Sequence, residues 1–237
     1  MNLAIIQARM ASTRLPGKVL LPLGGKPMLE RMIERVRRAR LVDTLVVATT
    51  TEPEDEAIAD LCDRMGVPCY RGDEDDVLRR FDDVYNLYAR SRDDTIIRLT
   101  GDCPLSDPEV IDLVIRERIS SGADLAVNTG PGGQSYPDGL DVEAFTGAAL
   151  VEANTWSAEA SDREHVTRYV RRQSTRYQVL YCAHDPDLSG RKWSVDTPAD
   201  YRRVGAIFEA LYPANPEFGM DDILEWEARC GGRSAQA

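Results

Sequence analysis

The chain opens on the stretch LAIIQARMASTRLPGK, residues 3–18, in which a short apolar run passes directly into a cationic loop. Leu3 to Ile6 are apolar and partly β-branched, which is typical of a buried strand. The loop after them holds three cationic side chains, several small residues and a Pro-Gly turn. Because open α/β sheets bind ligands at the carboxyl ends of their strands, this stretch predicts a ligand site directly after the first strand.

Further apolar runs alternate with segments of helical periodicity through the first half of the chain. We expect strands over 45–49, 95–99 and 124–127, and helices over 28–36, 54–65, 76–89 and 108–120. This alternation predicts an α/β fold with a mostly parallel central sheet. After Gly122, strand-like pieces over 136–145 and 177–182 and helical stretches over 147–153 and 163–173 predict a small antiparallel insertion that rejoins the main sheet.

The length of the chain predicts one domain. Its 237 residues, 43% of them apolar, are enough to bury one substantial core. We expect that domain to cover residues 1–230, with a short last helix over 221–227. The small and polar residues 231–237 predict a mobile tail.

Composition excludes some partners and compartments. Forty acidic and 29 basic residues give a net charge of −11, which argues against nucleic-acid binding but leaves room for a local basic pocket. With no apolar run of 18 residues and no basic leader, neither a membrane span nor secretion is expected. The chain has five cysteines, an odd number, and none of them forms a CxxC pair. This pattern predicts reduced thiols in a cytoplasmic protein. The cysteines are Cys62, Cys69, Cys103, Cys182 and Cys230. We interpret Cys103 as a structural residue rather than a reactive one.

The first loop is suited to holding phosphates. Its backbone N–H groups could form directed hydrogen bonds to a triphosphate, and Arg9, Arg14 and Lys18 could neutralise its charge. The spacing fits neither GxGxxG nor GxxxxGK[ST], so a dinucleotide fingerprint and a P-loop are rejected. Taken alone, the loop is equally consistent with a solvated basic turn.

The same loop resembles the nucleotide-binding signature of a known family. Gln7-Ala8-Arg9 through Leu15-Pro16-Gly17-Lys18 is similar to the cytidylyltransferases that make CMP-sugar acids, including acylneuraminate and deoxy-manno-octulosonate cytidylyltransferases. The likeness is closest to the spore-coat polysaccharide branch. It continues in order through four more blocks, RLTGDCPL at 98–105, YPDGLDVE at 136–143, REHVT at 163–167 and WSVDTP at 193–198. The resemblance implies a Rossmann-like, GT-A-like nucleotidyltransferase fold, a three-layer sandwich.

The resemblance also implies a reaction. CMP would pass from CTP to an acidic sugar, a sugar phosphate or a phosphonate-like acceptor, with release of pyrophosphate and with Mg²⁺ as cofactor. Asp102 and Asp196 would be the metal ligands, which suits a cation that prefers hard oxygen atoms. Together with Arg9 and Lys18 they form the predicted catalytic set. Alternatively, Asp196 could cap a helix that begins at Thr197-Pro198.

Two further sets of contacts follow from the resemblance. The nucleotide-binding set is Gln7, Ala8, Arg9, Arg14, Lys18, Arg98, Thr100 and Asp102. The acceptor-binding set is Tyr136, Asp138, Asp141, Glu143, Arg163 and His165, with Asp141 and Glu143 expected on one face of a strand. Other interpretations stay open: Arg98 could pair with a carboxylate, the acidic residues could lie on a half-exposed strand, and His165 could be structural. We interpret Lys192 as a surface residue and the acidic run at 73–76 as a solvated helix start.

The expected partners are CTP, the acceptor and a second copy of the chain in a homodimer. The traits YPDGLD and REH belong to the spore-coat-like branch and differ from the better-known CMP-sialate and CMP-octulosonate enzymes. That difference falls on the acceptor side. The nucleotide chemistry therefore transfers by resemblance, but the identity of the acceptor does not.

Two other functions compete with this interpretation. A metal-dependent glycosyltransferase of similar architecture would use a nucleotide sugar and usually carries a DxD motif, whereas the segment TGDCP at 100–104 has a single aspartate. A non-catalytic nucleotide-sensing domain would lose the metal carboxylates or the loop cations. Because Arg9, Lys18, Asp102 and Asp196 are all present, the sequence favours an active nucleotidyltransferase.

Overall fold

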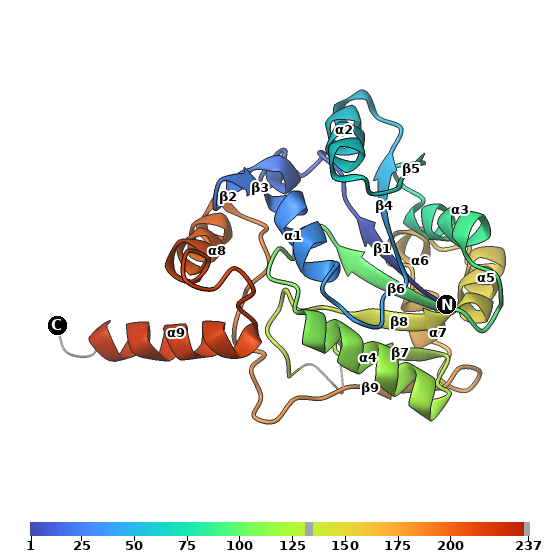
Figure 1. Cartoon of the computed structure of the whole chain (residues 1–237). Helices are drawn as coiled ribbons and strands as arrows, with labels where there is room; N and C mark the ends of the chain where they lie inside the picture. Colours follow the sequence, from blue (N-terminus) through green and yellow to red (C-terminus); the bar gives the residue numbers. More distant parts are fainter. Residues whose placement is uncertain (131–134, 235–237) are drawn as a thin grey trace.

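Seven strands form the central sheet of the computed structural model, which describes residues 1–130 and 135–234 (Figure 1). Their order across the sheet is β5-β4-β1-β6-β8-β7-β9. In chain order the strands are β1 Asn2–Gln7, β4 Thr44–Thr50, β5 Cys69–Gly72, β6 Thr95–Thr100, β7 Leu125–Val127, β8 Glu143–Thr146 and β9 Val179–Tyr181. Strand β8 is antiparallel to both of its neighbours, and the other pairings are parallel. The predicted, mostly parallel α/β sheet is confirmed.

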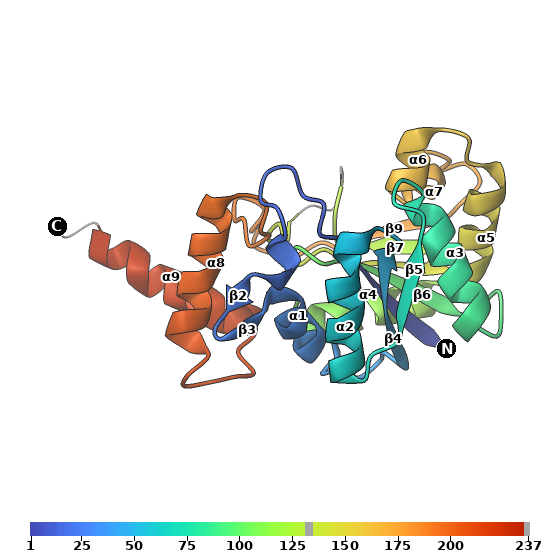
Figure 2. The same cartoon turned by 90° about the horizontal axis from the view of Figure 1, so that it is seen from above.

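Helices cover both faces of this sheet and make three layers (Figure 2). On β1, Ala4 and Ile6 point into one core cluster while Leu3 and Ile5 point into the other, as the period of two in a strand requires. The first face carries α1 Met28–Val36, α2 Glu56–Met65, α4 Pro108–Ser121, α8 Pro198–Leu211 and α9 Met220–Ser234; the second carries α3 Val77–Tyr88, α5 Gly147–Trp156, α6 Ala160–Glu164 and α7 Arg168–Arg171. Outside the layers lie the two short helices η1 Lys18–Leu20 and η2 Pro53–Asp55 and the antiparallel pair β2 Pro22–Leu23 and β3 Lys26–Pro27.

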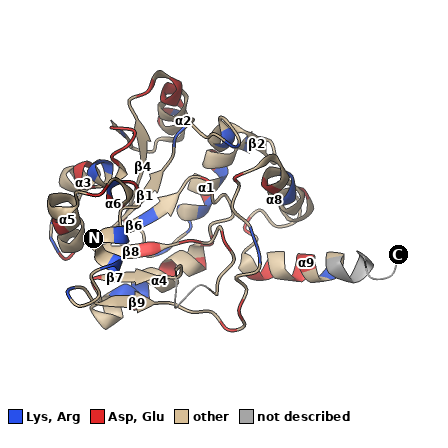
Figure 3. Ribbon diagram, turned by 180° about the vertical axis from the view of Figure 1, so that it is seen from behind, with Lys and Arg blue, Asp and Glu red and all other residues tan. Residues whose placement is uncertain are grey.

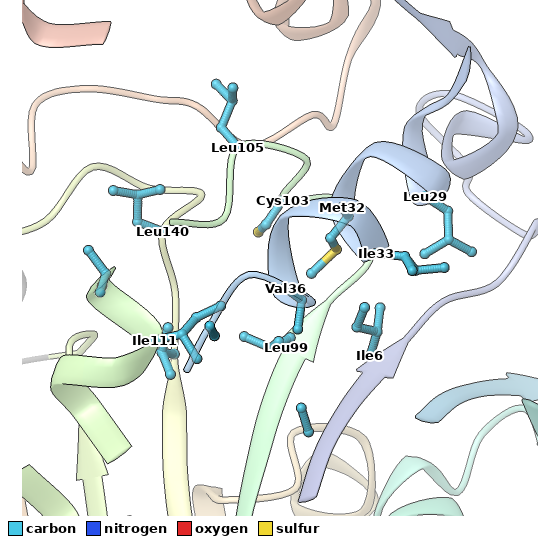
Figure 4. Close-up of a cluster of buried hydrophobic side chains, with 14 of the residues drawn as sticks. Ile6, Leu29, Met32, Ile33, Val36, Leu99, Cys103, Leu105, Ile111 and Leu140 are labelled. Atoms are coloured by element: carbon cyan, nitrogen blue, oxygen red, sulfur yellow. The ribbon is translucent and has the colours of Figure 1, made fainter. Parts of the chain in front are cut away.

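The apolar core on the first face anchors the loop that follows β6 (Figure 4). Cys103 and Leu105 are buried among side chains of α1, including Met32, and Cys103 is 2% exposed. Burial, and then the charge of Asp102, raises the pKa of the Cys103 thiol, so this cysteine is a packing residue as expected. The loop is therefore fixed from below by its apolar residues, while Asp102 remains partly exposed at its tip.

The expected strand over 136–145 is wrong for most of its length. Regular pairing begins only at Glu143, and before it Asp138 makes an isolated bridge to Lys192. Gly139 has a φ of +112°, which L side chains rarely adopt, and an added Cβ would lie 2.4 Å from the backbone nitrogen of Ser194. The segment is therefore turned against the chain at 193–194, and the expected common face for Asp141 and Glu143 does not form.

Three other boundaries differ from the sequence prediction. The helix expected over 163–173 is divided into α6 and α7, because Val166 between them has a φ of +40°. Strand β5, with four half-buried residues, was not predicted from its weak pattern. Helix α9 continues to Ser234, through the first part of the predicted tail, and residues 235–237 of that tail lie outside the described residues.

Candidate active site

A cleft of about 720 Å³ lies at the carboxyl ends of β1 and β6, where the sequence predicted a ligand site. The first loop forms one wall, the β5–α3 connection another, and α6 closes part of a third. Cationic and polar side chains dominate the lining. The residues that line it are Gln7, Ala8, Arg9, Ala11, Ser12, Thr13, Arg14, Lys18, Val19, Glu74, Asp75, Val77, Arg80, Arg98, Thr100, Gly101, Asp102, Ala160, Glu164, His165 and Asp196.

Lys18 joins the two predicted metal carboxylates. Its Nζ atom donates to Asp102 Oδ2 at 3.0 Å and to Asp196 Oδ1 at 3.1 Å, and a third hydrogen bond of 2.7 Å reaches the carbonyl of Val195. The side chain is only 12% exposed. Two carboxylates that are 94 positions apart in the chain thus contact the same ammonium group. Three members of the predicted catalytic set, Lys18, Asp102 and Asp196, therefore lie together.

Asp196 is surrounded by cations. Arg14 Nη2 lies 2.8 Å from its Oδ1, and Lys192 Nζ donates to its Oδ2 at 2.8 Å. Burial alone would raise the pKa of this carboxyl, but the hydrogen bonds from Lys192 and Lys18 outweigh it and lower the pKa. The alternative role as a helix cap is wrong, because Thr197 caps α8 in a capping box. Asp196 is therefore held ionised in the cleft.

Backbone contacts hold the two carboxylate segments beside the first loop. The N–H of Val195 donates to the carbonyl of Asp102 at 2.8 Å, which ties the last block of the site to the loop after β6. Gly101 lies so close to Ala8 that an added Cβ would approach the Ala8 Cβ to 2.9 Å. Glycine at this position therefore permits the loop after β6 to pack against the start of the cationic loop.

Arg9 faces the opposite wall of the cleft, where its Nη1 lies 3.0 Å from Glu74 Oε1. Arg80 supports that wall from below: it is 2% exposed and donates to the backbone carbonyls of Asp73 and Glu74. Sequence reasoning placed the run 73–76 in solvent as a helix start. Asp76 does cap α3, but Glu74 and Asp75 line the cleft. No pattern in the sequence predicts that Arg80 contacts this acidic run.

A buried ion-pair network lies beneath the centre of the cleft. Arg98 on β6 donates to Gln7 Oε1 at 2.8 Å and to Glu143 Oε2 at 2.9 Å, and Arg171 contacts the other oxygen of Glu143. Figure 3 shows the basic segment of β6 beside the acidic segment of β8. Arg98 thus pairs with a carboxylate and lines the cleft as well, while Glu143, 8% exposed, acts from below. Both of its carboxylate oxygens are paired with arginines, and its direct contact with the acceptor stays a prediction.

The remaining predicted acceptor residues divide into two groups. His165 lines the cleft, and Asp138 reaches its edge through Lys192, whose Nζ donates to Asp138 Oδ2 at 3.1 Å. Asp141 is half-buried near Asp138; burial, and then the charges of Asp138, Glu143 and Asp102, raises its pKa to about 7. Lys192, whose side chain is 38% exposed, lies at the surface as interpreted, and its ammonium group also links Asp138 to Asp196.

Tyr136 and Arg163 do not line the cleft. The ring of Tyr136 is buried and makes an edge contact with His184, with 5.2 Å between ring centroids and 67° between ring planes, and it faces a separate cavity beside α4 and α9. Arg163 holds both carboxylate oxygens of Asp76, at 2.8 and 2.6 Å, and therefore fastens α6 to the start of α3. A bidentate pair of this kind occupies the guanidinium group, so Arg163 makes a contact within the fold here, and its contact with the acceptor stays a prediction.

Known proteins share this sequence and this geometry. The sequence profile described as cytidylyltransferase matches residues 3–215. The chain belongs to the cytidylyltransferase family. A spore coat polysaccharide biosynthesis protein of Bacillus subtilis is 35% identical over 214 residues, which are 87% of this chain and 86% of that protein. A solved cytidylyltransferase of Leptospira borgpetersenii has a TM-score of 0.90 and 29% identity, over 98% of this chain and 95% of its own.

A more distant structure shares the fold. The structure of CMP:2-keto-3-deoxy-manno-octonic acid synthetase complexed with CTP has a TM-score of 0.63 and 19% identity, over 88% of this chain and 98% of its own. These findings confirm the predicted family, its resemblance to the spore coat branch and the nucleotidyltransferase fold. The cytidylyltransferase is thus an enzyme that transfers CMP from CTP, and the glycosyltransferase alternative is not favoured.

Proposed function

We propose that this cytidylyltransferase transfers CMP from CTP to an acidic sugar, a sugar phosphate or a phosphonate-like acceptor, with release of pyrophosphate. The observation that carries the proposal is the convergence of Asp102 and Asp196 on Lys18 beside the cationic first loop. A relative in spore coat polysaccharide biosynthesis and a CTP complex of a synthetase for a keto-sugar acid support the acceptor class.

The carboxylates fit a divalent metal, for which we propose Mg²⁺. Asp102 and Asp196 present oxygen atoms within 3.1 Å of one shared cationic atom, so a cation of higher charge can take the same position. Among the described residues, no three carboxylate, thiol or imidazole groups are clustered to bind a metal by themselves. That donor set suits Mg²⁺, which keeps several waters and is completed by phosphate oxygens. When bound, the ion would be held by Asp102 and Asp196 and would stabilise negative charge on the phosphates.

The protein side chains would then act by position and charge. Arg14 and Lys18, which contact Asp196 in this structure, are placed to turn to the triphosphate, and Arg9 reaches it from the opposite wall. Their charges would stabilise the negative charge that develops as an acceptor oxygen attacks the α-phosphorus and pyrophosphate leaves in line. An acidic acceptor can supply an oxygen that has already lost its proton, so no separate base is required.

The first test is release of pyrophosphate from CTP, UTP, ATP and GTP with Mg²⁺, over a panel of sugar acids, sugar phosphates and phosphonates. We expect release that depends on both CTP and an acceptor and falls at least 100-fold in Asp196→Asn. Asp60→Asn, which alters an exposed aspartate on α2, is the matched control and should keep full activity. Turnover of a nucleotide sugar without pyrophosphate release, or full activity in Asp196→Asn, would contradict the proposal.

We further propose a cytoplasmic homodimer. All five cysteines are free thiols, which supports a reducing compartment. Within the described part of the chain, none of the helices has both the length and the apolar character that a bilayer crossing demands. The homodimer rests on the family resemblance, and light scattering of the purified protein at two concentrations measures it; a monomer mass at both would refute it.

A further inference from the structure

The amide group of Gln7 has a fixed orientation at the floor of the cleft. Arg98 Nε donates to Gln7 Oε1 at 2.8 Å, and a guanidinium group has no acceptor atom. The oxygen must therefore face Arg98, and the amide nitrogen with its two hydrogens is turned away. Among the described residues, none accepts a hydrogen bond from that nitrogen, and Gln7 lines the cleft. Gln7 thus offers donors, and only donors, to a molecule bound there.

Arg98 adds a positive charge to the same floor. Glu143 lies between Arg98 and Arg171, so the three side chains together carry one net positive charge. Burial would raise the pKa of the Glu143 carboxyl, but the charges of the two arginines outweigh it and lower the pKa, so the carboxylate stays ionised. The Nη2 atom of Arg98 has no hydrogen-bond partner among the described residues. A half-buried cation with an unused donor favours an anionic partner.

This floor adjoins the segment that the sequence associated with the acceptor. His165 lines the same cleft, and Thr167, two residues later, donates to Glu143 Oε2 at 2.9 Å. Between them the buried Val166 has a φ of +40°, a conformation that β-branched residues rarely adopt. Backbone strain of this kind concentrates at ligand sites. Of the cations that contact Asp196, Arg14 and Lys18 come from the first loop, and Lys192 comes from the segment just before Asp196.

We propose that Gln7 and Arg98 bind the acidic group of the acceptor, a carboxylate or a phosphonate, while the first loop binds the triphosphate of CTP. This inference rests on the proposed function and deepens it, because it names the part of the acceptor that the enzyme recognises. It differs from the expectation that Gln7 and Arg98 contact the nucleotide. The floor selects for acidic acceptors, since a neutral hydroxyl group would leave uncompensated the one net positive charge that Arg98, Glu143 and Arg171 share.

The test is an NMR titration with two small probes, acetate for a carboxylate and methylphosphonate for a phosphonate. The ¹⁵N-labelled protein is first saturated with Mg²⁺ and α,β-methylene-CTP, which fills the nucleotide site without reacting. The side-chain amide signal of Gln7, identified by its loss in Gln7→Leu, reports the anion directly. We expect that signal to shift with a millimolar dissociation constant for at least one probe.

Two variants and a control separate this role from a structural one. Gln7→Leu removes the donors, and we expect binding of the probe to weaken about 10-fold; Gln7→Glu adds a repelling charge and should weaken it further, towards 100-fold. Gln178→Glu makes the same charge change at an exposed position beside β9 and should leave binding unchanged. Equal probe affinity in the wild type and both Gln7 variants would overturn the proposal.

The nucleotide analogue distinguishes this inference from the proposed function. If the analogue itself moves the Gln7 signal and abolishes the response to both probes, Gln7 belongs to the nucleotide site and the inference is wrong, although the proposed function stands. If the analogue does not bind, the proposed function fails. The probes are then titrated without it, and dependence on Gln7 still decides whether this floor binds anions.

Discussion

Replacing Asp141 by asparagine removes a carboxyl group whose ionised form is destabilised in the folded chain by burial and by neighbouring carboxylates. The pKa of Asp141 is raised to about 7 by burial first and then by Asp138, Glu143 and Asp102, and Arg98 offsets only part of this. In the unfolded chain the same group titrates near 3.9. The folded state therefore binds this proton more tightly than the unfolded state does.

The sign of the effect follows from that difference. The contribution of protonated Asp141 to stability is fully present below the unfolded pKa of about 4, is lost as the pH rises towards 7, and is gone above it. A shift of about 3 units corresponds to about 4 kcal/mol. Because Asp141 is coupled to other carboxylates, we expect about 2 to 4 kcal/mol in practice. Asparagine has nearly the same shape and loses none of this as the pH rises.

The measurement is urea unfolding of wild type and Asp141→Asn at pH 4.5, 6 and 8, with EDTA to remove metal ions. The variant should be more stable than the wild type by about 2 to 4 kcal/mol at pH 8, with a difference that shrinks towards zero at pH 4.5. Asp60→Asn, at an exposed site on α2, should show no such trend. A difference that is constant with pH, or a variant that is less stable at pH 8, would refute the reasoning.

Three further results are expected. Glu143→Gln leaves two half-buried arginines without their carboxylate and should lower the free energy of unfolding by about 3 kcal/mol, measured in urea. An unchanged midpoint would contradict this. In Gly139→Ala the added Cβ would press against the backbone of Trp193 and Ser194, so the melting temperature should fall. In Gly190→Ala the added Cβ has no atom within 4 Å, so the melting temperature should not change. Lys18→Met should reduce turnover at least 100-fold. It should also tighten Mn²⁺ binding several-fold in the absence of nucleotide, because Lys18 competes with the metal for the two carboxylates. Electron paramagnetic resonance measures the Mn²⁺ affinity, and weaker binding in the variant would count against that competition.

The layers of the fold could be predicted because they follow from local periodicity. Apolar runs and helical spacing are properties of neighbouring residues, so β1, β4, β6 and the main helices were found nearly at their observed positions, whereas the weakly patterned β5 was not. The break at Val166 and the turn at Gly139 were not found. Each depends on contacts with distant segments, since Gly139 lies against the backbone of Trp193 and Ser194. A period count over one segment does not contain that information.

The site divides in the same way. Asp102, Asp196 and Lys18 were predicted to meet because the five sequence blocks resemble one family, and the structure brings all three together. The partners of individual Lys and Arg side chains were predicted less well. The ion pair of Arg163 with Asp76 and that of Lys192 with Asp196 were not predicted. Which carboxylate a cation meets is decided by tertiary packing, so a single sequence does not determine it.

The arrangement of charge explains how an acidic protein can bind a polyanion. The chain carries a net charge of −11, yet Arg14, Lys18 and Lys192 all contact Asp196. In the proposed reaction, Arg14 and Lys18 would exchange the Asp196 carboxylate for phosphate oxygens, and Asp196 would be free to hold a divalent cation. Each charge keeps a partner, so little desolvation is left uncompensated. Lys192 contacts the other oxygen of Asp196 and Asp138, so it can hold Asp196 in place during that exchange.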